Sequence, residues 1–155
     1  GYVGVKYGAG WLAGMYVNLA GSGVIFADIK QFRMDNPNEP GTEIRYACLE
    51  GPEAAAYLRG TSRLVDGRAE IKFPDHFIAV ASGVGMTIQL TPLSGDSKGL
   101  ALIEKRADGF VVTELLGGMG AYGFDYNVMA VRKGYEDYQV IQLKAEEMPA
   151  VPETK

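Results

Sequence analysis

Cysteine and histidine are nearly absent from this sequence, which holds one of each, Cys48 and His76. A single cysteine excludes an intramolecular disulfide framework. Cys48 lies in an apolar run, so we expect it to be a small buried hydrophobic residue and not a catalytic thiol. No histidine, cysteine and carboxylate side chains share the spacing of metal ligands, so we expect neither a metal site nor a cofactor.

An excess of basic residues is also missing. The formal net charge is -4, from 15 Lys and Arg against 19 Asp and Glu. The basic residues stand among acidic ones, as Lys105 and Arg106 do beside Asp108. Neutralising the phosphates of a nucleic acid requires clustered Lys and Arg. We therefore expect no nucleic-acid partner.

Charged residues are absent between positions 7 and 27, a stretch long enough to raise a transmembrane helix. Two of its glycines, Gly10 and Gly14, even have the spacing used between membrane helices. Glycine, however, weakens a helix by about 1 kcal/mol relative to alanine. The side chains also follow a two-residue period, with Trp11, Met15 and Leu19 on one face. The pattern predicts an extended strand and no membrane insertion.

An extended segment that is apolar on one face has to cover that face. It can pack on the rest of the chain or pair with copies of itself, with glycine where backbones approach closely. Left alone, its exposed edges and aromatic residues would favour aggregation. We therefore interpret residues 1–34 as the end of a glycine-rich shaft in which three chains intertwine, although sequence physics does not fix the number three.

The composition changes after Asp28. Residues 35–41, Asp-Asn-Pro-Asn-Glu-Pro-Gly, read as a polar linker, and we expect the domain boundary inside it. Residues 35–145 then form a head, and residues 146–155, with two prolines, form a flexible tail.

The head reads as short strands separated by turns. Asp66-Gly67 and Ala107-Asp108-Gly109 are hairpin signals, and Pro74-Asp75 suits the start of a short helix over 75–81. The strands are expected at 44–49, 55–65, 68–73, 85–93, 99–106, 110–115, 122–133 and 138–143. The sequence therefore predicts an all-β fold, a short-strand β-sandwich or small barrel with one short helix.

The order of several short motifs in the head indicates a family. These motifs are Lys-Gln-Phe-Arg-Met-Asp-Asn-Pro at 30–37, Tyr-Ala-Cys-Leu-Glu-Gly-Pro-Glu-Ala at 46–54, Tyr-Leu-Arg-Gly at 57–60, Gly-Arg-Ala-Glu-Ile at 67–71, Pro-Asp-His-Phe at 74–77, Gln-Leu-Thr-Pro at 89–92 and Val-Arg-Lys at 131–133. The series resembles the C-terminal heads of phage-tail-fibre-like proteins and of the mosaic adhesive trimers of predatory bacteria. Many members have His-Pro where this chain has Asn36-Pro37, and asparagine suits a turn as well. The resemblance implies a homotrimer displayed outside the cell, and it implies no particular ligand.

An enzymatic reading is available but weaker. Glu50, Glu53 and His76 could share acid–base work if burial separated the pKa values of the two carboxyls. Glu50-Gly51-Pro52-Glu53 reads as a tight turn, however, which would keep Glu53 at the surface. The glycine run at 117–120 lacks the lysine and helix of a nucleotide loop, so we expect a plain loop there. We therefore expect no enzyme.

Ligand contacts are expected on loops held by the strands. The loop at 94–98 offers Asp96 and Lys98, and the glycine-flanked loop at 117–123 offers Tyr122. An aromatic face near an acid and a base suits a sugar, while Tyr122 could equally be core packing at the start of the last strand. The leading hypothesis is an adhesin tip that binds a cell-surface glycan or envelope polymer. The alternatives are a structural fibre cap without a ligand and a glycan-processing enzyme using Glu50 or Glu53.

Overall fold

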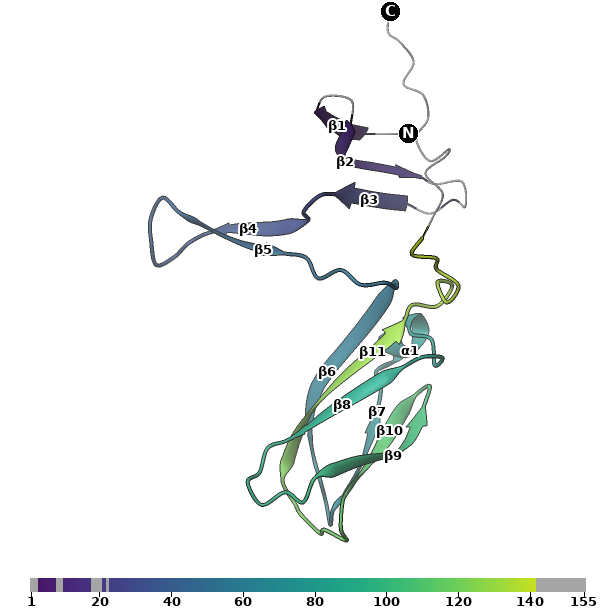
Figure 1. Ribbon diagram of the computed structural model, residues 1–155. Helices are drawn as coiled ribbons and strands as arrows, with labels where there is room; N and C mark the ends of the chain where they lie inside the picture. Colours follow the sequence, from purple (N-terminus) through teal and green to yellow (C-terminus); the bar gives the residue numbers. More distant parts are fainter. Residues whose placement is uncertain (1–2, 8–9, 18–20, 22, 142–155) are drawn as a thin grey trace, which may run out of the picture. The chain divides into compact units, whose positions relative to one another are not determined.

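The computed structural model describes residues 3–7, 10–17, 21 and 23–141, and Figure 1 shows their elements. Eleven strands and one short helix make up its regular structure, so the prediction of an all-β chain is confirmed. The chain divides into two compact units. Unit 1 is Gly1–Glu50 with Ile141–Lys155, and unit 2 is Gly51–Val140.

Unit 2 contains two antiparallel three-stranded sheets that face each other. One has the order β6-β11-β8 and the other β7-β10-β9, and the described residues form no closed barrel. The bounds are β6 Ala55–Arg63, β7 Arg68–Lys72, β8 Thr87–Pro92, β9 Leu100–Arg106, β10 Gly109–Glu114 and β11 Gly123–Val131. The sandwich alternative is therefore the correct one of the two predicted.

The core of unit 2 lies between these sheets. Phe110 of β10 and Phe124 and Val128 of β11 are fully buried, and all three belong to one hydrophobic cluster. The rings of Tyr126 and Phe110 pack edge to face, with 5.4 Å between their centroids, and this contact connects the two sheets. Alternate residues of β6 and β11 point into this cluster, as a half-buried sheet requires.

The predicted helix is confirmed as α1 (Asp75–Val80), which begins directly after Pro74. Pro74 holds an extended conformation and cannot donate a backbone hydrogen bond, which suits a helix start. The helix buries Phe77, whose ring meets that of Phe73 edge-on at 5.3 Å. α1 therefore adds aromatic surface to the core.

The two hairpin signals have different outcomes. Ala107-Asp108 joins β9 to β10, which pair directly, so this hairpin is confirmed. Asp66 and Gly67 both have positive φ and form a tight turn closed by two bonds between Val65 and Arg68. The strands on either side then separate, because β6 pairs with β11 and β7 pairs with β10. The turn was predicted correctly, but the pairing of its strands was not.

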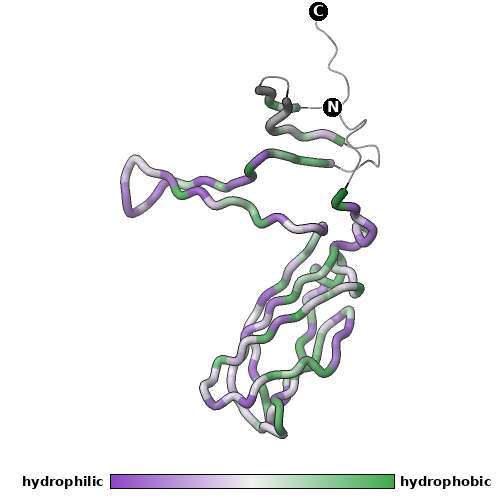
Figure 2. The backbone as a smooth tube through the Cα atoms, viewed as in Figure 1, coloured by the Kyte–Doolittle hydropathy of each residue, from purple (hydrophilic) through white to green (hydrophobic). Residues whose placement is uncertain are grey.

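Unit 1 contains a three-stranded antiparallel meander. Its strands are β1 (Val3–Tyr7), β2 (Gly10–Val17) and β3 (Gly23–Ala27), in the order β1-β2-β3. The described strands of the charge-free segment, at 10–17 and 23–27, are thus extended, as predicted, and they pair with each other. Figure 2 shows β3 as a hydrophobic stretch of the backbone. No helix in the described part of the chain is long and apolar enough to cross a membrane.

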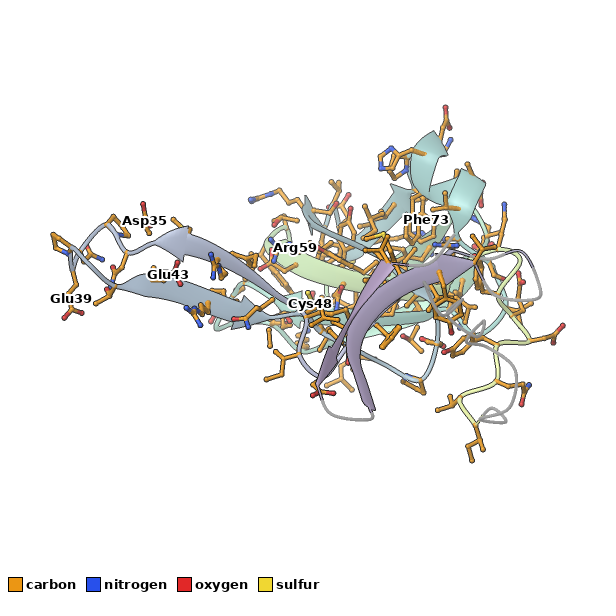
Figure 3. All side chains as sticks on the ribbon, turned by 90° about the horizontal axis from the view of Figure 1, so that it is seen from above. Asp35, Glu39, Glu43, Cys48, Arg59 and Phe73 are labelled. Atoms are coloured by element: carbon orange, nitrogen blue, oxygen red, sulfur yellow. The ribbon has the colours of Figure 1, made fainter. Side chains whose placement is uncertain are left out.

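Unit 1 also contains a hairpin of β4 (Gln31–Asp35) and β5 (Glu43–Ala47). The predicted linker at 35–41 is instead the ordered turn of this hairpin, since the Asn36 amide donates to Thr42 Oγ1 at 3.0 Å and the two backbones also bond. Figure 3 shows Asp35, Glu39 and Glu43 at the outer end of the hairpin. The two units divide at Glu50 and Gly51, later than the boundary expected inside 35–41.

Two further expectations need correction. Cys48 is exposed, because it follows β5 in a part of the chain where no described residue is buried. The last predicted strand, 138–143, does not form over 138–141, and its remaining residues lie outside the described part. The tail at 146–155 also lies outside it.

Phe110→Ala should destabilise unit 2 by about 3–5 kcal/mol, because it removes a fully buried ring that contacts both sheets. Ile103→Ala, at a half-exposed position of β9, is the control and should change stability by less than about 0.5 kcal/mol. Urea denaturation followed by circular dichroism measures both. Equal effects of the two substitutions would contradict the described core.

Candidate functional site

Three loops of unit 2 are joined by hydrogen bonds next to the end of β10. The turn at 65–68 contributes Gly67, whose N–H donates to the Gly120 carbonyl at 2.9 Å and whose carbonyl accepts from the N–H of Glu114 at 2.7 Å. The loop at 94–99 contributes the Gly99 carbonyl, which accepts from the N–H of Leu115 at 2.9 Å. The third loop, 115–122, is therefore fixed to both of the others.

The carboxylate of Glu114 is the centre of this arrangement, and the residue is only 5% exposed. Its Oε1 accepts from the backbone N–H of Lys98 at 3.1 Å and from the hydroxyl of Tyr122 at 2.9 Å. Its Oε2 accepts from the backbone N–H of Gly120 at 2.8 Å. One side chain thus binds Lys98 of the 94–99 loop and both Gly120 and Tyr122 of the 115–122 loop.

The Tyr122 hydroxyl extends this network to Ser97. Tyr122 Oη and Ser97 Oγ lie 2.6 Å apart. Since the single hydroxyl proton of Tyr122 is donated to Glu114, the Ser97 hydroxyl is the donor to Tyr122. Ser97 Oγ also accepts from the N–H of Gly99 at 3.1 Å. The loop conformation is thereby set by a continuous chain of hydrogen bonds.

The protonation states follow from these contacts. The backbone N–H groups of Lys98 and Gly120 lower the pKa of the Glu114 carboxyl, against the opposing effect of burial. Burial is the main reason that the pKa of Tyr122 is raised, and the adjacent Glu114 adds to it. At neutral pH, Glu114 is therefore an anion and Tyr122 a neutral donor, which stabilises the network.

Glycine is required where the third loop passes Glu114. A Cβ at Gly118 would overlap the Glu114 carboxylate, so only glycine lets the backbone approach it. The neighbouring Leu116 has a positive φ and is 86% exposed, and Met119 is 68% exposed. The glycine run at 117–120 is thus a loop, as predicted, and it holds apolar side chains in solvent.

The predicted ligand residues lie around this network. Asp96 and Lys98 are exposed, and the backbone of Lys98 shares the Oε1 atom of Glu114 with Tyr122. Tyr122 is half-buried, packs against the core cluster and uses its hydroxyl internally. The core alternative for Tyr122 therefore describes most of its contacts, and its contact with a ligand stays a prediction.

Glu114 was not among the predicted residues. In the sequence it ends the run Phe-Val-Val-Thr at 110–113, where an acid reads as the polar end of a strand. The signal that could have identified it is an acid between an apolar strand and a glycine-rich loop, since exposed backbone N–H groups nearby can satisfy a buried carboxylate.

The residues of the enzymatic alternative belong to different units, Glu50 to unit 1 and Glu53 and His76 to unit 2. Glu50 is paired with Lys30 at 2.6 Å in unit 1. Glu53 and His76 are exposed in unit 2, and no hydrogen bond or ion pair joins them in the described part of the chain. Within that part, no three histidine, cysteine or acidic side chains are grouped as metal ligands would be. The candidate site is therefore taken as the loops at 65–68, 94–99 and 115–122, here called the Glu114 loops, which are joined by backbone hydrogen bonds and by those of one buried carboxylate.

Glu114→Gln should lower the melting temperature by several degrees at pH 7, because an amide cannot replace the anion as acceptor of three donors. The folded-state pKa of Glu114 lies below the unfolded-state value of about 4.3, so the unfolded protein binds more protons between these two values. The stabilisation is therefore fully present above about pH 4.3 and is lost as the pH falls through the folded pKa. Thermal melts of both proteins at several pH values should show their difference shrinking on acidification.

Asp96→Asn serves as the control for this measurement, since it removes a carboxylate from an exposed position of the 94–99 loop, which Glu114 contacts. Its melting temperature should match that of the wild type across the whole range. A difference for Glu114→Gln that is as large at pH 3 as at pH 7 would show that the charge of Glu114 does not hold the loops.

Comparison with known proteins gives no relative: no family model matches the chain, and no curated protein or solved structure matches it. The resemblance to fibre heads that the motif order indicates stays a prediction. The function proposed below is supported by the geometry of this chain, and only the number of copies is taken from that resemblance.

Proposed function

We propose that this chain is the tip of a trimeric extracellular fibre, in which unit 2 is a head that binds a cell-surface glycan or envelope polymer. One observation carries this proposal, namely the uneven distribution of buried apolar side chains. Every buried hydrophobic residue in the described part of the chain lies between positions 64 and 130, inside unit 2. Unit 2 has its own core, whereas the described side chains of unit 1 include exposed apolar ones and no buried ones.

The meander of unit 1 exposes one apolar face. Its register aligns Val3, Met15 and Ile25 in a single row across three strands, and these residues are between 52% and 67% exposed. Val5 and Val17 lie on the same face. A sheet with one uncovered apolar face gains little stability by itself. This face therefore needs a cover.

The β4–β5 hairpin has the same property. Phe32 pairs with Tyr46 and Met34 with Ile44, so all four side chains share one face, and the first pair stacks edge-on at 5.3 Å. The opposite face has charges of both signs, with Glu43 between Arg33 and Arg45. The polar face suits solvent, and the apolar face needs a cover as well.

Further copies of the same chain are the occupant that we propose for these faces. The apolar side chains named above carry no charge, so identical rows of them can meet without burying an unpaired ion. Their eight large exposed side chains would bury on the order of 500–900 Å² per chain, and a standard interface buries about 800 Å² per partner. Three copies is the number that the resemblance implies.

The double substitution Met15→Lys and Ile25→Lys should convert the oligomer to monomers, because it buries two ammonium groups at the centre of the proposed interface. Light scattering coupled to size exclusion measures the mass. Val80→Lys and Val84→Lys, at exposed apolar positions of unit 2, are the matched control and should leave the trimer intact. A monomeric wild type, or a trimer that survives the first substitution, would contradict this part of the proposal.

Ligand binding by the head is supported by the Glu114 network. Loops that are fixed by hydrogen bonds can present side chains without a large ordering cost on binding. Asp96, Lys98 and Tyr122 lie on two such loops, with donors, acceptors and an aromatic ring. These groups match the hydroxyls and CH surfaces of a sugar.

Asp96→Ala with Lys98→Ala should reduce binding on a glycan array at least tenfold, without changing the melting temperature or the trimer. Tyr122→Phe separates the two roles of the tyrosine, since it keeps the ring and removes the hydroxyl bond to Glu114. It should lower the melting temperature and retain glycan binding. A wild-type trimer that binds nothing on the array would favour the structural cap instead.

A further inference from the structure

The sheet β6-β11-β8 has a second face, which points away from the core. Strand register decides which residues share it, because residues paired across strands lie on the same side. Leu58, Val128 and Ile88 form a row on the inner side. The adjacent row, Arg59, Asn127 and Gln89, therefore faces outward.

Polar side chains on this outer face are held in place by their neighbours. Asn127 Nδ2 donates to Gln89 Oε1 at 3.1 Å, which leaves the Asn127 carbonyl and the Gln89 amino group available to a ligand. In the next row, the Thr61 hydroxyl donates to Asp125 Oδ1 at 2.5 Å. The face thus offers ordered donors and acceptors side by side on a rigid strand surface.

An aromatic ring lies on the same face. Tyr57 precedes Arg59 by two positions on β6, and it is 68% exposed. Tyr57 is paired with Met129, and its ring is in no aromatic contact in the described part of the chain. A ring exposed to this degree, next to ordered amides, is available for stacking against an apolar ligand surface.

Two arginines give the face a positive charge. Arg59 and Arg63 project outward from β6, and neither forms an ion pair with any described acidic residue (Arg59 is labelled in Figure 3). The contrast with Arg106 is large, since Arg106 contacts Glu70, Glu104 and Asp108. Asp125 is the acidic side chain in the described rows of this face and accepts from Thr61, so two arginines and one acid leave a local charge of +1 on a chain of net charge -4.

We infer that this outer face binds an anionic polysaccharide, along a strip that runs from Tyr57 to Arg63. Arginine pairs with carboxylate, sulfate or phosphate groups, the two amides and Asp125 take hydroxyls, and the Tyr57 ring stacks on a sugar. From Tyr57 to Arg63 the strip extends along β6 for roughly 20 Å, so it suits a polymer more than one sugar. This inference rests on the proposed function as a binding head, and it names the ligand class and a surface separate from the Glu114 loops.

Other occupants fit the face less well. A second copy of the chain would have to place a pair of acids against the two arginines. One group of acids on unit 2, Glu70, Glu104 and Asp108, is already paired with Arg106. Nucleic acid fits less well, because neutralising its closely spaced phosphates requires clustered Lys and Arg, and this face has two arginines on one strand. A hydroxyl-rich anionic polymer matches the amides and the charge together.

The test compares two double variants that change the charge equally. Arg59→Gln with Arg63→Gln removes two cations from the proposed face, and Arg68→Gln with Lys72→Gln removes two exposed cations from β7, on the other sheet. Biolayer interferometry with the full chain measures binding to polygalacturonate, to dextran sulfate and to neutral dextran. We expect binding to one or both anionic polymers and at least tenfold weaker binding by the first variant. The β7 variant should lose less than threefold, and neutral dextran should bind little.

A third variant tests the stacking contact. Tyr57→Ala should weaken binding of the anionic polymer at least fivefold at unchanged melting temperature, whereas binding by a purely ionic surface would not change.

Equal losses of binding in the two double variants, or no binding of wild-type protein to either anionic polymer, would overturn the inference. A change of oligomeric mass in the Arg59 and Arg63 variant would assign the face to contacts between copies and would overturn it too. If Asp96→Ala with Lys98→Ala abolishes glycan binding while the sheet-face variants bind normally, the inference fails and the proposed function stands.

Discussion

An apolar sheet face has to be removed from water, and the two units of this chain meet that constraint in different ways. In unit 2 two sheets face each other, so that Phe110 from one and Phe124 and Val128 from the other are fully buried. In unit 1 the row of Val3, Met15 and Ile25 stays exposed. Hydrophobic burial can thus stabilise unit 2 within one chain, whereas for unit 1 we propose that further copies of the chain supply the cover.

A buried charge sets the second constraint, at the end of β10. Glu114 is shielded from solvent and forms no ion pair with a described cation, so hydrogen-bond donors from the neighbouring loops are what mainly stabilises its charge. Those donors are the backbone groups of Lys98 and Gly120 and the hydroxyl of Tyr122. The loops therefore cannot move independently of the carboxylate. The contacts that satisfy the charge also fix the conformation of the 94–99 loop, on which Asp96 and Lys98 lie.

The sequence predicted an element correctly where residues within that element decide its structure. The two-residue period of 10–17 predicted a strand, Pro74-Asp75 predicted α1, and Ala107-Asp108-Gly109 predicted the β9–β10 hairpin. The predictions failed where contacts with residues elsewhere in the chain decide the structure. Nothing in residues 55–68 shows that β6 pairs with β11 and not with β7, since that choice is made by core packing between segments far apart in the chain. Glu114 was missed for the same reason, because its donors come from loops on both sides of β10. The ordered turn at 35–41 was misread because prolines and glycine also serve hairpin loops.

The two proposed binding surfaces and the proposed oligomer support one another physically. A sheet face with Arg59, Arg63 and Tyr57 makes contacts that are each weak, because exposed ion pairs in water contribute little. When copies are joined through unit 1 and one of them binds a polymer, the others are held close to the same polymer. Their binding then takes place at a high effective concentration. A repetitive polymer can use such an array, while a single small sugar cannot reach from one copy to the next. Weak contacts on unit 2 and an apolar assembly surface on unit 1 are therefore the combination expected of a protein that holds onto a polymer-covered surface.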